Sequence, residues 1–335
     1  MNGGRLSIQE YKDGILKSNR FTLAKAITLV ESTRAEDEKV ANELIDAILP
    51  FTGKSIRIGI TGVPGVGKST FIESFGTHLT NQERKVAILT VDPSSQLTKG
   101  SILGDKTRME LLSKNQNAFI RPSASRDSLG GVASRTRESM LLCEAAGFDV
   151  IIVETVGVGQ SEVAVRSMVD FFLLLMLAGA GDELQGIKKG IMEMADALVI
   201  TKADAGNVAK ATEARADYQH ALNFLRSTSS WKPKVMTCSA LEEKGIDDIW
   251  KLVRDFHQQM TSSGQFDKQR EQQQLSWFAE SFHHLLQNEI LKTPVLSTQR
   301  ISLEKEVSAG ATSPVYAARK LMDAYRQFLR EGSDS

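Results

Sequence analysis

Short apolar runs alternate with amphipathic segments between about residues 55 and 258. The runs are continuous rather than alternately apolar and polar, which is typical of strands covered on both faces. The segments between them repeat apolar positions every three to four residues, so we expect helices that connect parallel neighbours. The pattern therefore predicts an α/β domain built on a mostly parallel sheet. The predicted strands are 55–61, 85–92, 117–122, 148–155, 170–177, 196–204 and 233–240, and the helices that accompany them are 68–81, 132–147, 207–226 and 245–260.

One of these runs, FFLLLMLAGA at 171–180, is apolar enough to resemble a membrane segment. It extends for only about ten residues between Asp170 and Asp182, whereas a membrane-spanning helix needs roughly twenty. We therefore expect a buried central strand at this place, and no membrane segment.

Helical patterns precede and follow the α/β domain. Residues 7–50 carry apolar side chains at helical spacing, and Pro50 and Gly53 mark the end of that region. After Thr261 the chain is polar and typical of a linker, and it then continues with apolar helical stripes, the last over 314–330. These stripes either pack on the core or form an oligomerisation arm. The predicted parts are an N-terminal helical extension at 1–53, an α/β domain at 54–260 and a C-terminal helical arm at 261–335.

The charges of the chain cancel. Its 335 residues include 41 Lys and Arg and 41 Asp and Glu, and such a chain lacks the bulk attraction that nonspecific binding to nucleic acid or to an anionic membrane needs. Two cysteines, Cys143 and Cys238, are too few for a disulfide framework or a zinc cluster, and the first residues contain no apolar signal core. These features predict a cytoplasmic protein without nucleic-acid or membrane partners.

The strongest local motif is GVPGVGKS at 62–69, which matches the phosphate-binding pattern G-x-x-x-x-G-K-[ST] between a predicted strand and a predicted helix. Its glycines let consecutive N–H groups point inward at a phosphate, and the start of the helix adds the positive end of its dipole. We expect Lys68 to bridge the β- and γ-phosphates and the Ser69 hydroxyl to bind Mg²⁺. The predicted phosphate-binding residues are Gly62, Val63, Pro64, Gly65, Val66, Gly67, Lys68, Ser69 and Thr70.

Two further motifs predict that the base is guanine. Thr201-Lys-Ala-Asp204 ends one predicted strand, and an Asp carboxylate there accepts hydrogen bonds from guanine N1–H and N2–H₂, which adenine cannot offer. Cys-Ser-Ala-Leu at 238–241 ends the next strand, where a backbone N–H meets the guanine O6. The predicted base-site residues are Lys202, Asp204, Ser239, Ala240 and Leu241, and we expect GTP to be preferred over ATP.

Three acids are candidates for binding Mg²⁺ and sensing the γ-phosphate: Asp92, Asp105 and Glu154. Glu154 follows a strand at the position of the D-x-x-G motif. Asp92 could instead form only a turn and Asp105 only a helix start. No residue stands out as a general base, so turnover is expected to be slow until an arginine or an ordered loop assists it. The candidate arginines are Arg108, Arg126, Arg135 and Arg137.

Five segments resemble those of the methylmalonyl-CoA mutase-associated G3E-class GTPases, the bacterial MeaB/ArgK type and its mitochondrial counterpart. They are GVPGVGKST, VDPSSQLTKGSILGDKTRM, RPSASRDSLGGVASRTRE, VIIVETVGVGQSE and GDELQGIKKGIMEMAD. One position differs from many GTPases, because Thr201 stands where they have Asn. The resemblance implies a P-loop GTPase domain, with a homodimer formed through the C-terminal arm.

What the resemblance implies about function is a chaperone for a cobalamin enzyme. GTP hydrolysis would gate the loading of adenosylcobalamin onto, and the protection of, methylmalonyl-CoA mutase or a related cobalamin-dependent acyl-CoA mutase. A cobalamin adenosyltransferase is a further candidate partner. Lys68, Asp92, Asp105 and Glu154 would form the catalytic phosphate and Mg²⁺ site together with Ser69, and 179–189 would be an extra switch loop.

Three alternatives stay open at this stage. The first is a nickel-delivery GTPase, which would need Cys or His ligands near a switch loop. The second is a transport-system kinase or ATPase, which would prefer ATP. The third is a scaffold that binds GTP without turning it over.

Overall fold

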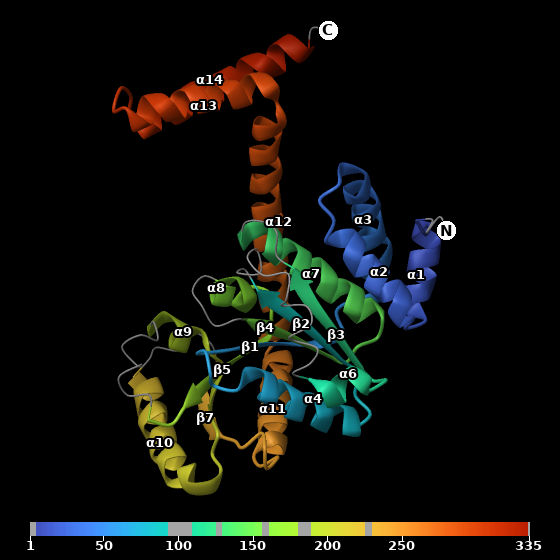
Figure 1. The fold of residues 1–335 in the computed structure, drawn as a ribbon, viewed down its shortest axis with the longest axis vertical. Coiled ribbons are helices and arrows are strands. Elements are labelled where there is room, and N and C mark those ends of the chain that lie inside the picture. The colour runs from blue at the N-terminus through green and yellow to red at the C-terminus, as the bar shows by residue number, and fades with distance from the viewer. Residues whose placement is uncertain are drawn as a thin grey trace. The chain divides into compact units, whose positions relative to one another are not determined.

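The computed structural model describes residues 5–92, 109–124, 129–155, 161–179, 189–224 and 230–333. Its core is a seven-stranded sheet in which all paired strands are parallel, in the order β3-β2-β4-β1-β5-β6-β7 (Figure 1). The prediction of an α/β fold on a mostly parallel sheet is confirmed. The strands are β1 (Ile56–Gly62), β2 (Val86–Asp92), β3 (Ala118–Ala124), β4 (Val150–Thr155), β5 (Phe171–Leu177), β6 (Ala197–Thr201) and β7 (Lys234–Thr237).

The apolar run after Asp170 is the strand β5, as predicted. Phe171 to Met176 are all buried, because β5 lies between β1 and β6 and is covered on both faces. Among the described residues, no helix combines the length and the apolar character needed to cross a membrane.

Helices cover both faces of the sheet. One face carries α7 (Leu129–Ala145) and α8 (Ser161–Arg166), and the other carries α4 (Lys68–Asn81) and α11 (Ile246–Ser262) (Figure 1). Beneath the second face, the Phe71 and Phe75 rings stack with centroids 5.5 Å apart, and Trp250 meets Phe75 edge-on at 6.3 Å. The remaining helices of this region are α6 (Glu110–Lys114), α9 (Lys189–Met194) and α10 (Val208–Phe224), with a short 3₁₀ turn at Ala205–Asn207.

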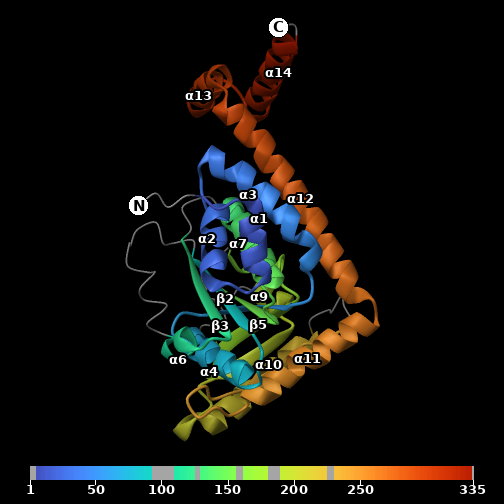
Figure 2. The same cartoon turned by 90° about the vertical axis from the view of Figure 1, so that its right-hand side faces the viewer.

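The predicted N-terminal helical region forms α1 (Ile8–Leu16), α2 (Arg20–Val30) and α3 (Ala35–Ile48). Ser7 begins α1 with a capping box, in which the side chains of Ser7 and Glu10 each bind the backbone N–H of the other. The three helices lie against α7 (Figure 2). Arg135 of α7 donates to the Glu31 carbonyl at 2.9 Å, and the Ser18 hydroxyl donates to the Ala146 carbonyl at 2.7 Å.

The long helix α12 (Gln265–Lys292) starts within the segment that the sequence suggested to be a linker, so that interpretation is wrong. Gln, Lys, Arg and Glu are good helix formers, and polarity alone does not separate a helix from a linker. The first turns of α12 also have a fixed attachment. Phe266 is 9% exposed, and Gln273 donates to the Val169 carbonyl at 2.8 Å.

Arg270 of α12 holds the amino ends of β1 and β5 together. Its guanidinium donates to the Asp170 carboxylate at 2.9 and 2.7 Å, and to the carbonyls of Gly53 and Ser55 at 2.7 and 2.6 Å. Asp170 is 1% exposed and also accepts the Arg57 N–H at 2.8 Å. Because the carboxylate is buried, the stability of the folded protein depends on these hydrogen-bond donors.

A second buried carboxylate extends this cluster. Glu144 of α7 receives two hydrogen bonds from the Arg57 guanidinium, at 2.9 and 3.0 Å, and one from the Gly53 N–H at 2.8 Å. Two ion pairs therefore link α7, β1, β5 and α12 at the edge of the sheet where the central strands begin.

The chain divides into two compact units, Met1–Gln273 and Gln274–Ser335. The boundaries predicted from the sequence, at 53/54 and 260/261, stay predictions. The second unit contains the end of α12, α13 (Pro294–Ser308) and α14 (Pro314–Ser333). Helix α14 covers the predicted 314–330, whereas α13 was not predicted. Leu296 and Leu303 of α13 are buried.

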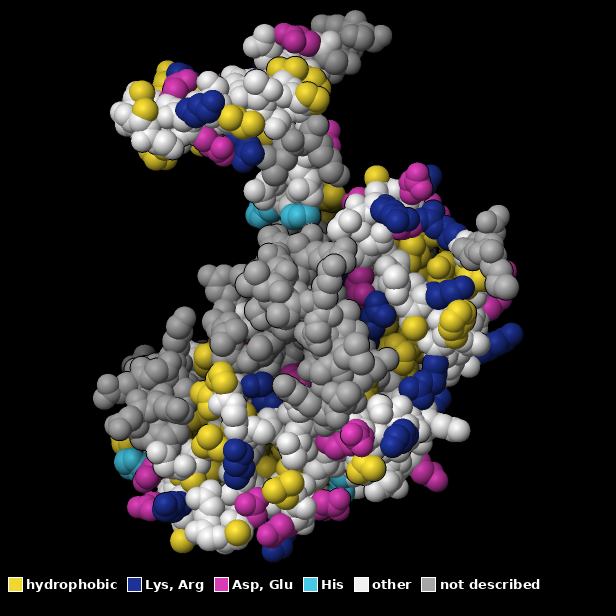
Figure 3. Space-filling model, viewed as in Figure 1, with side chains coloured by type: hydrophobic (Ala, Val, Ile, Leu, Met, Phe, Trp, Pro, Cys, Tyr) yellow, Lys and Arg dark blue, Asp and Glu magenta, His cyan; other side chains and the backbone are white. Residues whose placement is uncertain are grey.

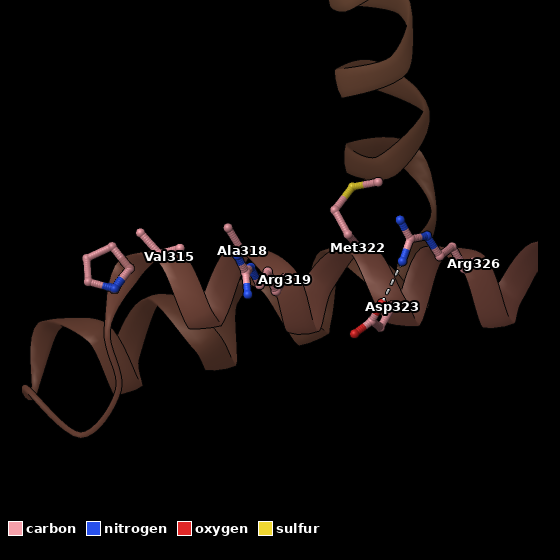
Figure 4. A pocket seen from close by; sticks show the side chains of 7 residues that line it. Val315, Ala318, Arg319, Met322, Asp323 and Arg326 are labelled. Atoms are coloured by element: carbon pink, nitrogen blue, oxygen red, sulfur yellow. Dashed lines mark hydrogen bonds and ion pairs between the residues drawn. The ribbon is translucent and has the colours of Figure 1, made fainter.

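Large apolar side chains remain exposed within the second unit. Hydrophobic side chains are visible on the surface of α13 and α14 (Figure 3). Val315, Ala318 and Met322 line a shallow hollow on α14 beside the ion pair of Asp323 and Arg326, whose atoms are 3.0 Å apart (Figure 4). On α12, Phe278 and Phe282 stack with centroids 6.4 Å apart and are 71% and 51% exposed.

We expect Arg270→Ala to lower the free energy of unfolding by about 3 kcal/mol, because it leaves the Asp170 carboxylate buried without its cation. Lys268→Ala, at an exposed position of the same helix, is the matched control and should change that free energy by less than about 0.5 kcal/mol. Denaturant unfolding followed by circular dichroism measures both. Equal stability of the two variants would contradict the role given to Arg270.

Candidate functional site

The phosphate-binding motif lies at the carboxyl end of the central strand β1 and leads directly into α4. Gly65 and Gly67 have φ values of 80° and 92°, a region that glycine adopts without strain. The tip of the loop at Pro64 and Gly65 is exposed, whereas Val66 is fully buried and fixes the loop to the core. This is the strand–loop–helix context that the motif requires.

Lys68 folds back over the loop. Its ammonium donates to the Gly62 carbonyl at 2.8 Å and lies 3.4 Å from the Val63 carbonyl. Burial lowers the pKa of Lys68, while the negative charges of Glu154 and Glu162 raise it. The side chain is thus a partly desolvated cation at the start of a helix, which is a favourable place for a phosphate.

Glu154 and Asp92 lie at the carboxyl ends of neighbouring strands. In the parallel register Glu154 of β4 lies opposite Ile60 of β1 on one side and Thr90 of β2 on the other. Asp92 is the last residue of β2, so its backbone lies at the same edge of the sheet, but its side chain is outside the described structure. Asp105 also lies outside the described residues. Ser69, in the first turn of α4, is half-buried.

The base motif lies at the carboxyl end of β6, and the Cys-Ser-Ala-Leu loop follows β7. The Ser239 hydroxyl donates to Asp204 Oδ2 at 2.8 Å and accepts the Glu242 N–H at 3.1 Å. Ser239 is 1% exposed, and Ala203 N–H donates to the Cys238 carbonyl at 3.0 Å. These bonds join the two loops and fix the Asp204 carboxylate. Leu241, by contrast, is 78% exposed.

The base loop is also attached to the phosphate loop. The Thr201 hydroxyl donates to the Val66 carbonyl at 2.7 Å, and the Lys202 ammonium donates to the Gly65 carbonyl at 2.9 Å. Asn207 in turn donates to the Lys202 carbonyl at 2.8 Å, where the backbone of Lys202 has a φ of 56°. Thr201 thus connects the base loop to the phosphate loop, although many GTPases have Asn at this position.

Two of the four arginines that were candidates for assisting hydrolysis form hydrogen bonds with other parts of the fold. Arg135 bonds the end of α2, and Arg137 of α7 donates to the Ser167 hydroxyl beside α8 at 2.8 Å. Arg108 and Arg126 lie outside the described residues, as does most of the proposed switch loop at 179–189. Cys238, which precedes Ser239, is 1% exposed, and burial raises the pKa of its thiol to about 12.

Sequence reasoning missed two residues at this edge of the sheet. One is Asn207, three positions after Asp204, which stabilises the base loop. The other is Glu162, at the start of α8, which is only 1% exposed. The sequence gives little indication that Glu162 is buried. An acid directly after a glycine-rich loop is usual at the exposed start of a helix.

The chain is similar in sequence to known proteins over most of its length. A family described as "Methylmalonyl Co-A mutase-associated GTPase MeaB" has a model that matches residues 23–294. The GTPase ArgK of Escherichia coli (strain K12) is 51% identical over 289 residues, which cover 84% of this chain and 86% of that protein. The "Methylmalonic aciduria type A homolog, mitochondrial" of Mus musculus is 45% identical over 328 residues, which cover 93% of this chain and 78% of that protein.

A solved structure is similar over nearly the whole chain. The protein named "LAO/AO transport system kinase" superposes with a TM-score of 0.76 at 40% identity, over 95% of this chain and 97% of that one. The sequence of this chain thus matches one family over most of its length. The same chain contains the phosphate loop, the base loop joined to it and the sheet that carries both. The chain belongs to the methylmalonyl-CoA mutase-associated GTPase MeaB family.

Proposed function

We propose that this chain binds GTP with Mg²⁺, hydrolyses it slowly, and through its nucleotide state gates the loading of adenosylcobalamin onto a methylmalonyl-CoA mutase or a related cobalamin-dependent acyl-CoA mutase. One observation carries the choice of GTP. The Ser239 hydroxyl holds the Asp204 carboxylate at 2.8 Å, on a loop whose Lys202 bonds the phosphate loop. A carboxylate fixed in this way accepts two N–H donors of guanine and leaves adenine unpaired.

The residues of the chain have distinct tasks in hydrolysis. The N–H groups of the loop and the Lys68 ammonium bind the β- and γ-phosphates and stabilise the charge on their oxygens. Ser69 and the acids Glu154, Asp92 and Asp105 are the proposed metal ligands. They offer only oxygen, which Mg²⁺ prefers, whereas nickel is better held by imidazole or thiolate. Bound Mg²⁺ supplies positive charge beside the phosphate oxygens.

The partner is inferred from relatives. The family description names methylmalonyl-CoA mutase, and the mouse relative is named for methylmalonic aciduria. A cobalamin adenosyltransferase is a second proposed partner, since it would supply the cofactor. The proposed site of action is the cytoplasm.

A homodimer is proposed because of the apolar side chains that the second unit exposes. Phe278, Phe282 and Val315 are each more than half exposed, and apolar groups gathered on a surface commonly mark an interface. The arm at 261–335 is accordingly proposed to mediate dimerisation. Its first turns, up to Gln273, belong to the unit that contains the sheet.

The alternatives make different predictions. A transport-system kinase, as the solved relative is named, would bind ATP as tightly as GTP and form a stable phosphoprotein. A nickel-delivery GTPase would retain stoichiometric nickel after incubation and desalting. Among the described residues, no group of three or more His, Cys, Asp or Glu side chains is placed to hold a metal ion. A GTP-binding scaffold would release no phosphate in a single turnover.

We expect Asp204→Asn to weaken GTP binding by about 100-fold, because the amide replaces one acceptor of guanine N–H groups with a donor. The same variant should gain affinity for XTP, since xanthine carries an oxygen at position 2 that accepts from the new amide. Competition binding with GTP, XTP and ATP measures all three. Asp217→Asn, at an exposed position of α10, is the control for the lost charge. Unchanged nucleotide preference in Asp204→Asn would refute the base assignment.

We expect Phe278→Glu to convert a dimer into a monomer, because it places a charge in the proposed apolar interface without altering the core of either unit. Ser276→Glu, also exposed on α12, is the matched control and should remain dimeric. Light scattering during size-exclusion chromatography gives the mass of each. If Phe278→Glu stays dimeric, the interface lies elsewhere.

A further inference from the structure

Glu162 is a buried acid whose contacts among the described residues do not account for its burial. It lies in the first turn of α8 and is 1% exposed. Among the described residues its one hydrogen-bond partner is the neighbouring Ser161 hydroxyl, at 3.3 Å, and it forms no ion pair there. A buried carboxylate without a close cation is costly, and an apolar side chain would fill the same place more favourably. Such groups gather at functional sites.

The position of α8 brings this charge to the phosphate site. Helix α8 packs on β1, which ends in Gly62, and on β4, whose second-to-last residue is Glu154. The contact with β1 is close, since a Cβ built on Gly59 would lie 2.9 Å from the Val165 side chain. The cation of the site is Lys68, on which the negative charges of Glu154 and, to a smaller extent, Glu162 act through space.

The other end of α8 is fixed to the sheet. Arg166 donates to the Asp196 carboxylate at 2.8 and 3.3 Å, and Asp196 also accepts the Phe172 N–H at 2.8 Å. Arg137 binds Ser167 just beyond the helix. A displacement of Glu162 would therefore move the start of α8 while its end at Arg166 stays fixed.

We propose that Glu162 is a positioning residue that competes with the nucleotide phosphates for Lys68, an inference that rests on the proposed nucleotide site. In the absence of nucleotide the negative charges of Glu154 and of the buried Glu162 carboxylate both stabilise the Lys68 cation from a distance. When GTP binds, its phosphates take over the lysine and repel the carboxylate, so that phosphate binding is coupled to α8. Glu162 thus weakens nucleotide affinity and links the occupied site to the surface of that helix.

The test is nucleotide affinity of the full chain with Glu162→Gln, which keeps the size of the side chain and removes its charge. We expect GTP and GDP to bind about tenfold more tightly, the scale of one nearby charge in a partly desolvated site, and guanosine to bind as in the wild type. Glu162→Asp keeps the charge and should restore affinity to near the wild-type value. Glu193→Gln, exposed on α9, controls for the change in net charge.

Selective tightening for the phosphorylated ligands supports the competition, because a merely structural role would weaken binding or alter guanosine equally. Unchanged or weaker GTP binding by a folded Glu162→Gln, judged by its thermal unfolding, would overturn it. If the wild type binds no GTP, the proposed function fails with it. If the wild type binds GTP and the Gln variant gains nothing, only the role of Glu162 is lost.

Discussion

The phosphate loop must turn its N–H groups inward, and this leaves the carbonyl oxygens of Gly65 and Val66 to be bound from outside. The side chains of two consecutive residues at the end of β6 meet that need, with the Thr201 hydroxyl on Val66 at 2.7 Å and the Lys202 ammonium on Gly65 at 2.9 Å. Recognition of the base and of the phosphates therefore rests on one connected piece of backbone. Because Asp204 follows two residues later, the proposed base site and the phosphate loop are positioned by the same segment.

The opposite edge of the sheet has a different task. There Arg270 joins the buried Asp170 carboxylate and two carbonyls, and Arg57 joins Glu144. No nucleotide chemistry is proposed for these groups, which fix the amino ends of the central strands and the first turns of α12. In parallel sheets ligands bind at the carboxyl ends of the strands, so ion pairs at the amino ends can stabilise the fold without competing with the site.

The sequence was enough to predict the seven strands, because the central ones are buried on both faces and read as continuous apolar runs. The edge strand β7 is only partly buried. It was also enough to locate the motifs that are proposed to bind phosphate and guanine, since each is contiguous and follows a strand. It could not predict the pairing of Asp170 with Arg270, which are 100 positions apart, because nothing local to either residue marks the partner. The polar start of α12 was misread for the same reason, as its attachment to the sheet is a tertiary contact. The burial of Glu162 depends on how α8 packs, which the helical pattern of six residues cannot reveal.

The central claim is that nucleotide turnover at this site serves a cobalamin-dependent acyl-CoA mutase. Its most direct test is the rate of phosphate release from GTP by the full chain, alone and with such a mutase from the same organism, with Lys68→Ala as the control for the site. We expect slow release by the chain alone, a many-fold higher rate with the mutase, and no release by Lys68→Ala under either condition. A wild-type rate that the mutase leaves unchanged would contradict it.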